Sequence, residues 1–159
     1  VTGSGFPLAA SGFGGRYALN DDPKCTAPNQ VAVILEYAEG FHTQFTTHFG
    51  SSIDNEKTLF MFEKGSLRCR FGHFVGNPTY SSEGVDDSLE PQKLLETDPP
   101  RPGAAHVANW FDCIRNGGQP NANMEFGYKH GIATLMGDLA CTSGRKVIFD
   151  KTTREIRPA

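Results

Sequence analysis

The sequence has little of what marks a membrane protein, a disulfide-stapled secreted protein or a nucleic-acid-binding protein. No apolar run approaches the roughly 20 residues that cross a bilayer, so we expect no membrane span. Its 18 aspartates and glutamates outnumber its 15 lysines and arginines, and the net charge of −3 argues against nucleic acid or an anionic membrane as a partner. Four cysteines without a Cys-x-x-Cys spacing are too few for a disulfide scaffold.

The sequence also lacks an initiator methionine and a recognisable signal peptide. The chain begins at Val1, with no charged segment followed by an apolar one. A mature protein and a domain of a longer chain both fit this beginning. At 159 residues the chain can bury one real core, so a single domain over residues 1–159 is the expected organisation.

Recognised catalytic and metal-binding motifs are missing as well. The sequence contains no Gly-x-Ser-x-Gly and no His-Glu-x-x-His. His42 and His48 would share one face of a strand but lie roughly 20 Å apart, too far to hold one ion. Residues 12–15 (Gly-Phe-Gly-Gly) precede no helix, which favours a closely packed strand over a phosphate loop. We therefore assign no catalytic, cofactor-binding or metal-binding residues.

The first half of the chain is rich in short apolar or alternating runs that are typical of strands. The expected strands are 7–19, 31–37, 41–49, 58–62 and 66–71. Short turns join 31–37 to 41–49 and 58–62 to 66–71, which predicts two hairpins. Residues 72–103 are rich in Pro, Ser, Asp and Glu, and we expect them to form a long surface connection.

The second half predicts two helices, at 104–116 and about 124–143, followed by a strand at 146–150 that 154–157 would extend. Apolar residues at helical spacing form a core-facing stripe on each helix. These stripes are Val107, Trp110, Phe111 and Ile114, and then Ile132, Met136, Leu139 and Ala140. Gly144 stands where a left-handed residue would end the second helix. Since strands segregate from helices, the class is α+β: a mostly antiparallel open sheet with helices packed on one face.

A polar cluster at the start of the second helix is the candidate ligand site. Tyr128, Lys129 and His130 place three hydrogen-bonding side chains in its first turns, where backbone N–H groups also lack helical partners. Such a cluster suits a polyhydroxyl or carboxylate ligand, although an ordinary solvated helix face is the alternative. Cys113 and Cys141 fall on apolar helix faces, where free cysteine packs as a small hydrophobe.

The order of these segments resembles the C-terminal half of the Gfo/Idh/MocA oxidoreductases, the family of glucose–fructose oxidoreductase and inositol dehydrogenase. The matching stretches are 14–17 (Gly-Gly-Arg-Tyr), 31–37 with 40–41, 64–67 (Lys-Gly-Ser-Leu) and 106–150. This resemblance implies a glyceraldehyde-3-phosphate dehydrogenase-like C-terminal fold for the whole chain. It also implies a domain that binds substrate and forms homo-oligomers through the face of its sheet.

The resemblance further implies that residues 1–159 are a fragment of a longer parent protein, whose N-terminal Rossmann domain binds NAD or NADP. The family's catalytic lysine lies in a Glu-Lys-Pro motif that this chain lacks, so we expect the fragment alone to be inactive. The implied substrate is a polyhydroxyl compound, a sugar or cyclitol oxidised at a CH–OH group. Arg16 and Tyr17 join Tyr128, Lys129 and His130 as the predicted substrate-binding residues.

Two alternatives stay open at this point. The first is a stand-alone binding or assembly module with no enzymatic parent. The second is part of an NAD-dependent glycosidase, because one branch resembling this family cleaves glycosides by a redox route.

Overall fold

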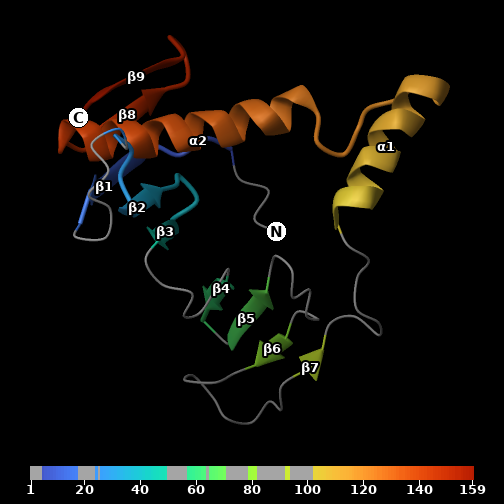
Figure 1. Ribbon diagram of the computed structural model, residues 1–159, viewed down its shortest axis with the longest axis horizontal. Helices are drawn as coiled ribbons and strands as arrows, with labels where there is room; N and C mark the ends of the chain where they lie inside the picture. The colour runs from blue at the N-terminus through green and yellow to red at the C-terminus, as the bar shows by residue number, and fades with distance from the viewer. Residues whose placement is uncertain are drawn as a thin grey trace. The chain divides into compact units, whose positions relative to one another are not determined.

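The computed structural model describes residues 5–17, 24, 26–49, 57–63, 65–70, 79–81, 92–93 and 102–159. The chain divides into two compact units, each with its own antiparallel sheet (Figure 1). The first unit combines Val1–Ser51 with Ala122–Ala159, and the second is Ser52–Asn121.

The sheet of the first unit has five strands in the order β3-β2-β1-β8-β9. They are β1 (Ala9–Gly15), β2 (Gln30–Glu36), β3 (His42–His48), β8 (Val147–Asp150) and β9 (Glu155–Pro158). At the centre, Ala10 of β1 pairs with Leu35 on one side and Val147 on the other. The beginning and the end of the chain therefore lie in one sheet.

Helix α2 (Met124–Ser143) packs on one face of this sheet, against β1, β2 and β8 (Figure 1). The buried core between them consists of Ala10, Ile132, Met136, Ala140, Val147 and Phe149. Two glycines let the helix come close. A Cβ on Gly12 would lie 3.2 Å from Cys141 Sγ, and one on Gly137 would lie 3.3 Å from Val33 Cγ1. The absence of a side chain at these positions sets the distance between helix and sheet.

Local signals fix both ends of α2. Asn123 is the N-cap, and its Oδ1 accepts a hydrogen bond from the Phe126 backbone N–H at 2.9 Å. Gly144 ends the helix with a left-handed φ of 64°, as the sequence predicts. Cys141 is a free, partly buried thiol, as expected, and burial raises its pKa.

The face of the five-stranded sheet that points away from α2 is called the open face. It carries the residues of each strand that alternate with the core-facing ones. Phe13, 67% exposed, and Ile34 are its large apolar side chains on β1 and β2. Lys146 Nζ lies 2.7 Å from Glu36 Oε1, which links the β2 and β8 sides of the sheet across β1. The buried Ala9 stands opposite Glu36 in register, and its small side chain leaves room for this ion pair.

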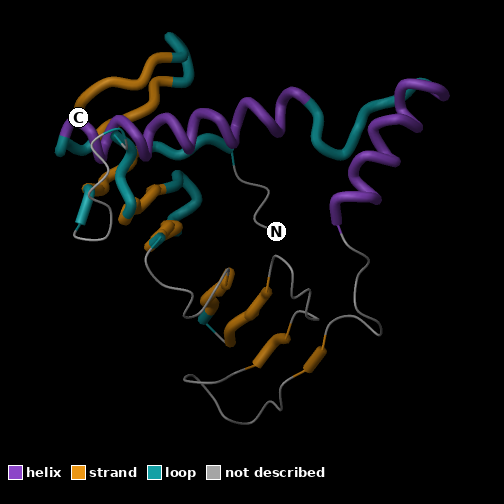
Figure 2. The backbone as a smooth tube through the Cα atoms, in the orientation of Figure 1, coloured by secondary structure: helices purple, strands orange, loops and turns teal. Residues whose placement is uncertain are grey.

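The second unit holds a four-stranded antiparallel sheet and helix α1 (Pro102–Asn116) (Figure 2). Its strands, in spatial order, are β4 (Lys57–Phe62), β5 (Gly65–Arg70), β6 (Thr79–Ser81) and β7 (Gln92–Lys93). The hairpin of β4 and β5 confirms one sequence prediction. The two short strands β6 and β7 lie where a connection without strands was expected, because runs of two or three residues carry no readable alternation.

The predicted class, α+β with an antiparallel sheet and a helix on one face, is confirmed. One strand prediction needs correction, because 154–157 does not extend β8 but folds back as β9. Asp150 Oδ1 accepts hydrogen bonds from the backbone N–H groups of Thr152 and Thr153, and Arg154 has a φ of 60°. These local bonds make a tight turn where a continuous strand was expected. No helix in the described part of the chain is long and apolar enough to span a membrane.

The core-facing stripe predicted for α1 is wrong. Its members Val107, Trp110, Phe111 and Ile114 are 43–60% exposed. No described strand of the same unit packs along α1. The Trp110 and Phe111 rings pack on each other at 5.1 Å, and the Arg115 guanidinium lies 5.7 Å from the Phe111 ring centroid. Leu139 of α2, also predicted to face the core, is 41% exposed, because its position turns away from the sheet.

The packing of α2 predicts a large loss of stability at one position and almost none at its neighbour. Met136→Ala removes a fully buried side chain and should lower the free energy of unfolding by about 2–5 kcal/mol. Leu135→Ala, at a position that is 53% exposed, should change it by well under about 1 kcal/mol. Urea denaturation followed by circular dichroism measures both. Equal losses in the two variants would contradict the assigned helix face.

Candidate functional site

The predicted residues of α2 lie on its N-terminal half, which extends past the strands (Figure 1). The ring of Tyr128 packs edge-on against Phe6, with centroids 5.4 Å apart, and Phe6 packs in turn on the buried Phe149 at 5.0 Å. Tyr128 is 40% exposed. One part of the Tyr128 ring therefore packs on the core, and the exposed part is accessible to a ligand.

Lys129 is held by an acidic neighbour one turn earlier. Its Nζ lies 2.7 Å from Glu125 Oε1. The hydrogen bond and the positive charge of Lys129 lower the pKa of the Glu125 carboxyl. His130 is exposed, and its backbone carbonyl accepts the Thr134 hydroxyl at 3.0 Å. Because consecutive helical residues leave the axis in different directions, Tyr128, Lys129 and His130 point to three different sides.

Arg16 and Tyr17 follow the last residue of β1 and are both exposed. Asn29 holds this segment with two bonds. Its Oδ1 accepts the Tyr17 backbone N–H at 2.9 Å, and its Nδ2 donates to the Tyr17 carbonyl at 3.0 Å. The Tyr17 ring lies over Gly15, where a Cβ would be only 3.0 Å from it. The backbone at the end of β1 is thus fixed, and the Tyr17 ring folds back over the strand.

The structure does not bring these two groups together. The start of α2 lies near Phe6, before β1, whereas Cys141 near its end lies against Gly12. The helix therefore runs in the same direction as β1. Adding the rise of α2 from 128 to 141, about 20 Å, to that of β1 from 12 to 15, about 10 Å, places Tyr128 about 30 Å from Gly15, over which the Tyr17 ring lies.

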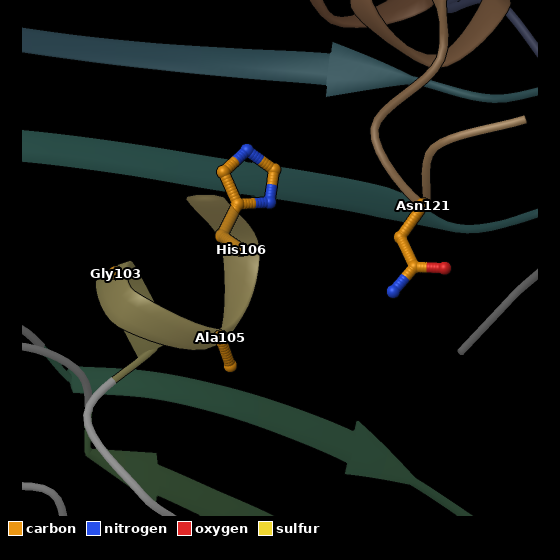
Figure 3. Close-up of a pocket in the computed structure, with 4 residues that line it drawn as sticks. All are labelled: Gly103, Ala105, His106 and Asn121. Atoms are coloured by element: carbon orange, nitrogen blue, oxygen red, sulfur yellow. The ribbon is translucent and has the colours of Figure 1, made fainter. Parts of the chain in front are cut away.

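An open hollow of about 490 Å³ lies beside α1, lined by Gly103, Ala105, His106 and Asn121 (Figure 3). The segment after α1 folds back to form it, because the Asn121 backbone N–H donates to Asn109 Oδ1 at 2.8 Å. All four lining residues are exposed. Sequence reasoning did not connect Asn109 with Asn121, since no periodic pattern relates a helix residue to a later loop.

The residues present do not fit a nucleotide cofactor at the glycine-rich segment. Gly12, Gly14 and Gly15 belong to β1, which pairs along its length with β2. A dinucleotide site needs backbone N–H groups at the start of a helix, and here they belong to a sheet ladder. Among the described residues no three His, Cys, Asp or Glu side chains gather to hold a metal ion.

No protein-family model and no curated protein matches the chain. Solved structures do. Aldose-aldose oxidoreductase from Caulobacter crescentus, complexed with glycerol, matches with 15% identity and a TM-score of 0.69, over 91% of this chain and 42% of that chain. The WlbA dehydrogenase from Bordetella pertussis, in complex with NADH and UDP-GlcNAcA, matches with 15% identity and a TM-score of 0.60, over 91% of this chain and 39% of that one.

A third match is an oxidoreductase from Agrobacterium radiobacter in complex with NAD+, L-tartaric acid and magnesium. It has 15% identity and a TM-score of 0.64, over 93% of this chain and 44% of that chain. The likeness to these oxidoreductases confirms the fold that the sequence resemblance implied. The chain spans less than half the length of each.

The contact between Lys129 and Glu125 gives a prediction for the candidate cluster. Lys129→Met should raise the pKa of the Glu125 carboxyl toward its ordinary value, because it removes both the hydrogen bond and the charge that lower it. Carbon-detected NMR titration of the Glu125 side chain measures this. Arg145→Met, which removes one positive charge beyond the other end of α2, should leave that pKa unchanged. A Glu125 pKa that does not respond to Lys129→Met contradicts the pairing.

Proposed function

We propose that this chain is the substrate-binding and dimerisation domain of an NAD(P)-dependent oxidoreductase that acts on a CH–OH group of a sugar or cyclitol. The observation that carries the proposal is the shared fold, which includes 91% of this chain and 42% of a sugar oxidoreductase. The proposed parent contains a further, nucleotide-binding domain. When bound there, NAD or NADP would exchange a hydride with the substrate carbon, and the domain described here would orient that carbon.

The chemistry of the candidate residues supports a polyhydroxyl or carboxylate substrate. Arg16 and Lys129 supply cationic donors, and the tyrosines and His130 can both donate and accept hydrogen bonds. Matched structures were crystallised with glycerol, UDP-GlcNAcA and L-tartaric acid, ligands that carry hydroxyl or carboxylate groups. Because about 30 Å separates the two groups of residues in one chain, we assign direct substrate contact to one of them. We favour the group on α2, and because its three side chains point to different sides of the helix, we assign the direct contact to Tyr128, which is anchored on the core through Phe6.

The open face of the five-stranded sheet supports the dimerisation part of the proposal. It carries exposed Phe13 and Ile34 beside the charged pair of Glu36 and Lys146. A broad face that mixes apolar and polar groups can pair with a copy of itself around a twofold axis. Covering it would bury apolar area that α2 does not reach.

The proposal predicts no micromolar affinity of the isolated chain for NADH, because the nucleotide site would lie in the rest of the parent protein. Isothermal titration calorimetry with NADH should give no binding heat in that range. The WlbA dehydrogenase, crystallised with NADH, is the positive control. Micromolar binding by the isolated chain would overturn this division of roles.

The dimer predicts a difference between two apolar positions of similar exposure on the first unit. Ile34→Asp on the open face should shift sedimentation equilibrium from dimer to monomer, because it places a desolvated charge in the interface. Leu139→Asp, on the side of α2 away from the sheet, should leave the dimer intact; the two side chains are 44% and 41% exposed. A monomeric wild-type chain at high micromolar concentration would disprove dimerisation through this face.

A further inference from the structure

We propose that Asn116 is a site of spontaneous deamidation and that its hydrogen bond to Asp112 controls the rate. Asn116 is the last residue of α1 and is followed by Gly117, the only Asn-Gly pair in the sequence. Both residues are exposed to solvent. The proposal concerns the second unit and is independent of the proposed function.

The reaction needs only this dipeptide and water. The deprotonated backbone nitrogen of Gly117 attacks the side-chain amide carbon of Asn116 and forms a five-membered succinimide. The bond from that carbon to Nδ2 breaks, and ammonia leaves with the proton gained from water. Water then opens the ring at either carbonyl, giving aspartate or isoaspartate. Glycine has no side chain to hinder the attacking nitrogen, which makes it the most favourable residue at this position.

The helix holds the two reacting atoms apart. Asn116 Nδ2 donates to Asp112 Oδ1 at 2.7 Å, one turn back along α1. Side chains on a helix lean toward its N-terminus, so this bond directs the amide carbon away from the Gly117 nitrogen. Attack requires the bond to break and the last turn of α1 to open.

The position of Asn116 at the end of α1 favours that opening. Gly117 and Gly118 have φ values of 74° and 125°, so the helix cannot continue past Asn116. A frayed last turn is the ordinary behaviour of such an end. Within the described part of the chain, the hydrogen bond from Asn116 to Asp112 is therefore the side-chain contact that opposes ring closure.

The product differs from the starting residue in a way that opposes the helix. A carboxylate at position 116 would face the Asp112 carboxylate, where the amide now donates a hydrogen bond. It would also lie at the negative end of the helix dipole. Once formed, the product weakens the turn that delayed its formation.

The test follows the peptide containing residue 116 by mass spectrometry while the whole chain is incubated near pH 8. Wild type should gain the mass of the acid and isoaspartyl products, faster by about tenfold per pH unit, because the reactive species is the deprotonated amide. Asp112→Ala should accelerate this about 2- to 12-fold, the factor that one side-chain hydrogen bond supplies. Asp112→Asn keeps an acceptor oxygen and should stay close to wild type.

Two controls make the outcome decisive. Asn116→Gln should abolish the product, since the longer side chain would have to close a less favourable six-membered ring. Asn121, exposed but followed by alanine, serves as the internal reference in every sample. Deamidation that is no faster at Asn116 than at Asn121 overturns the site. An unchanged rate in an Asp112→Ala variant with wild-type helical circular dichroism overturns the control by Asp112.

Discussion

The close approach of α2 to β1 and β2 is the constraint on which the first unit depends. Gly12 and Gly137 leave out the side chains that would hold the helix away, and the fully buried Met136 fills the space beside them. Because successive side chains of a strand point to opposite faces of the sheet, the residues that alternate with these core positions face the open side. The same packing therefore decides which groups are free for a partner. It also fixes Tyr128, which reaches the core through Phe6 at one end of β1.

The parts of this fold that could be predicted from the sequence are those with local causes. The bounds of α2 follow from the asparagine cap at 123 and the glycine at 144, and each acts within one turn. The hairpin of β2 and β3 follows from alternation on both sides of a glycine-containing turn. The direction of β9 was not predicted, because it depends on two hydrogen bonds to Asp150. The short strands β6 and β7 were not predicted either, because they are defined only by pairing with neighbouring strands.

The candidate site was predictable in position but not in arrangement. The sequence places Tyr128, Lys129 and His130 in the first turns of α2, and the structure agrees. Neither the Tyr128–Phe6 contact nor the direction of α2 along β1 has a local signal, since both arise from the packing of distant segments. The separation between this cluster and Arg16 with Tyr17 follows from that direction. The resemblance to known oxidoreductases added Arg16 and Tyr17 to the cluster on α2 but not the distance between the two groups.

Helix α1 shows what apolar periodicity can and cannot establish. The spacing of Val107, Trp110, Phe111 and Ile114 predicts which side of the helix favours burial, and the partner that buries it is a separate question. With these side chains about half exposed, α1 gains only part of the roughly 1.5–3 kcal/mol that full burial of each would contribute. A helix of 15 residues is marginal in water without such packing.

Single side-chain hydrogen bonds therefore contribute a large share of the stability of α1. Asn121 to Asn109 closes the following loop on the helix, and Asn116 to Asp112 closes its last turn. Each is a single net hydrogen bond of about 0.5–1.5 kcal/mol, comparable to the free energy that decides whether an exposed helix end is open or closed. The end of α1 is therefore governed by individual side chains, whereas the end of α2 also packs on a buried core. A partner that covered the apolar side of α1 would shift the equilibrium between the open and the closed last turn toward the closed form.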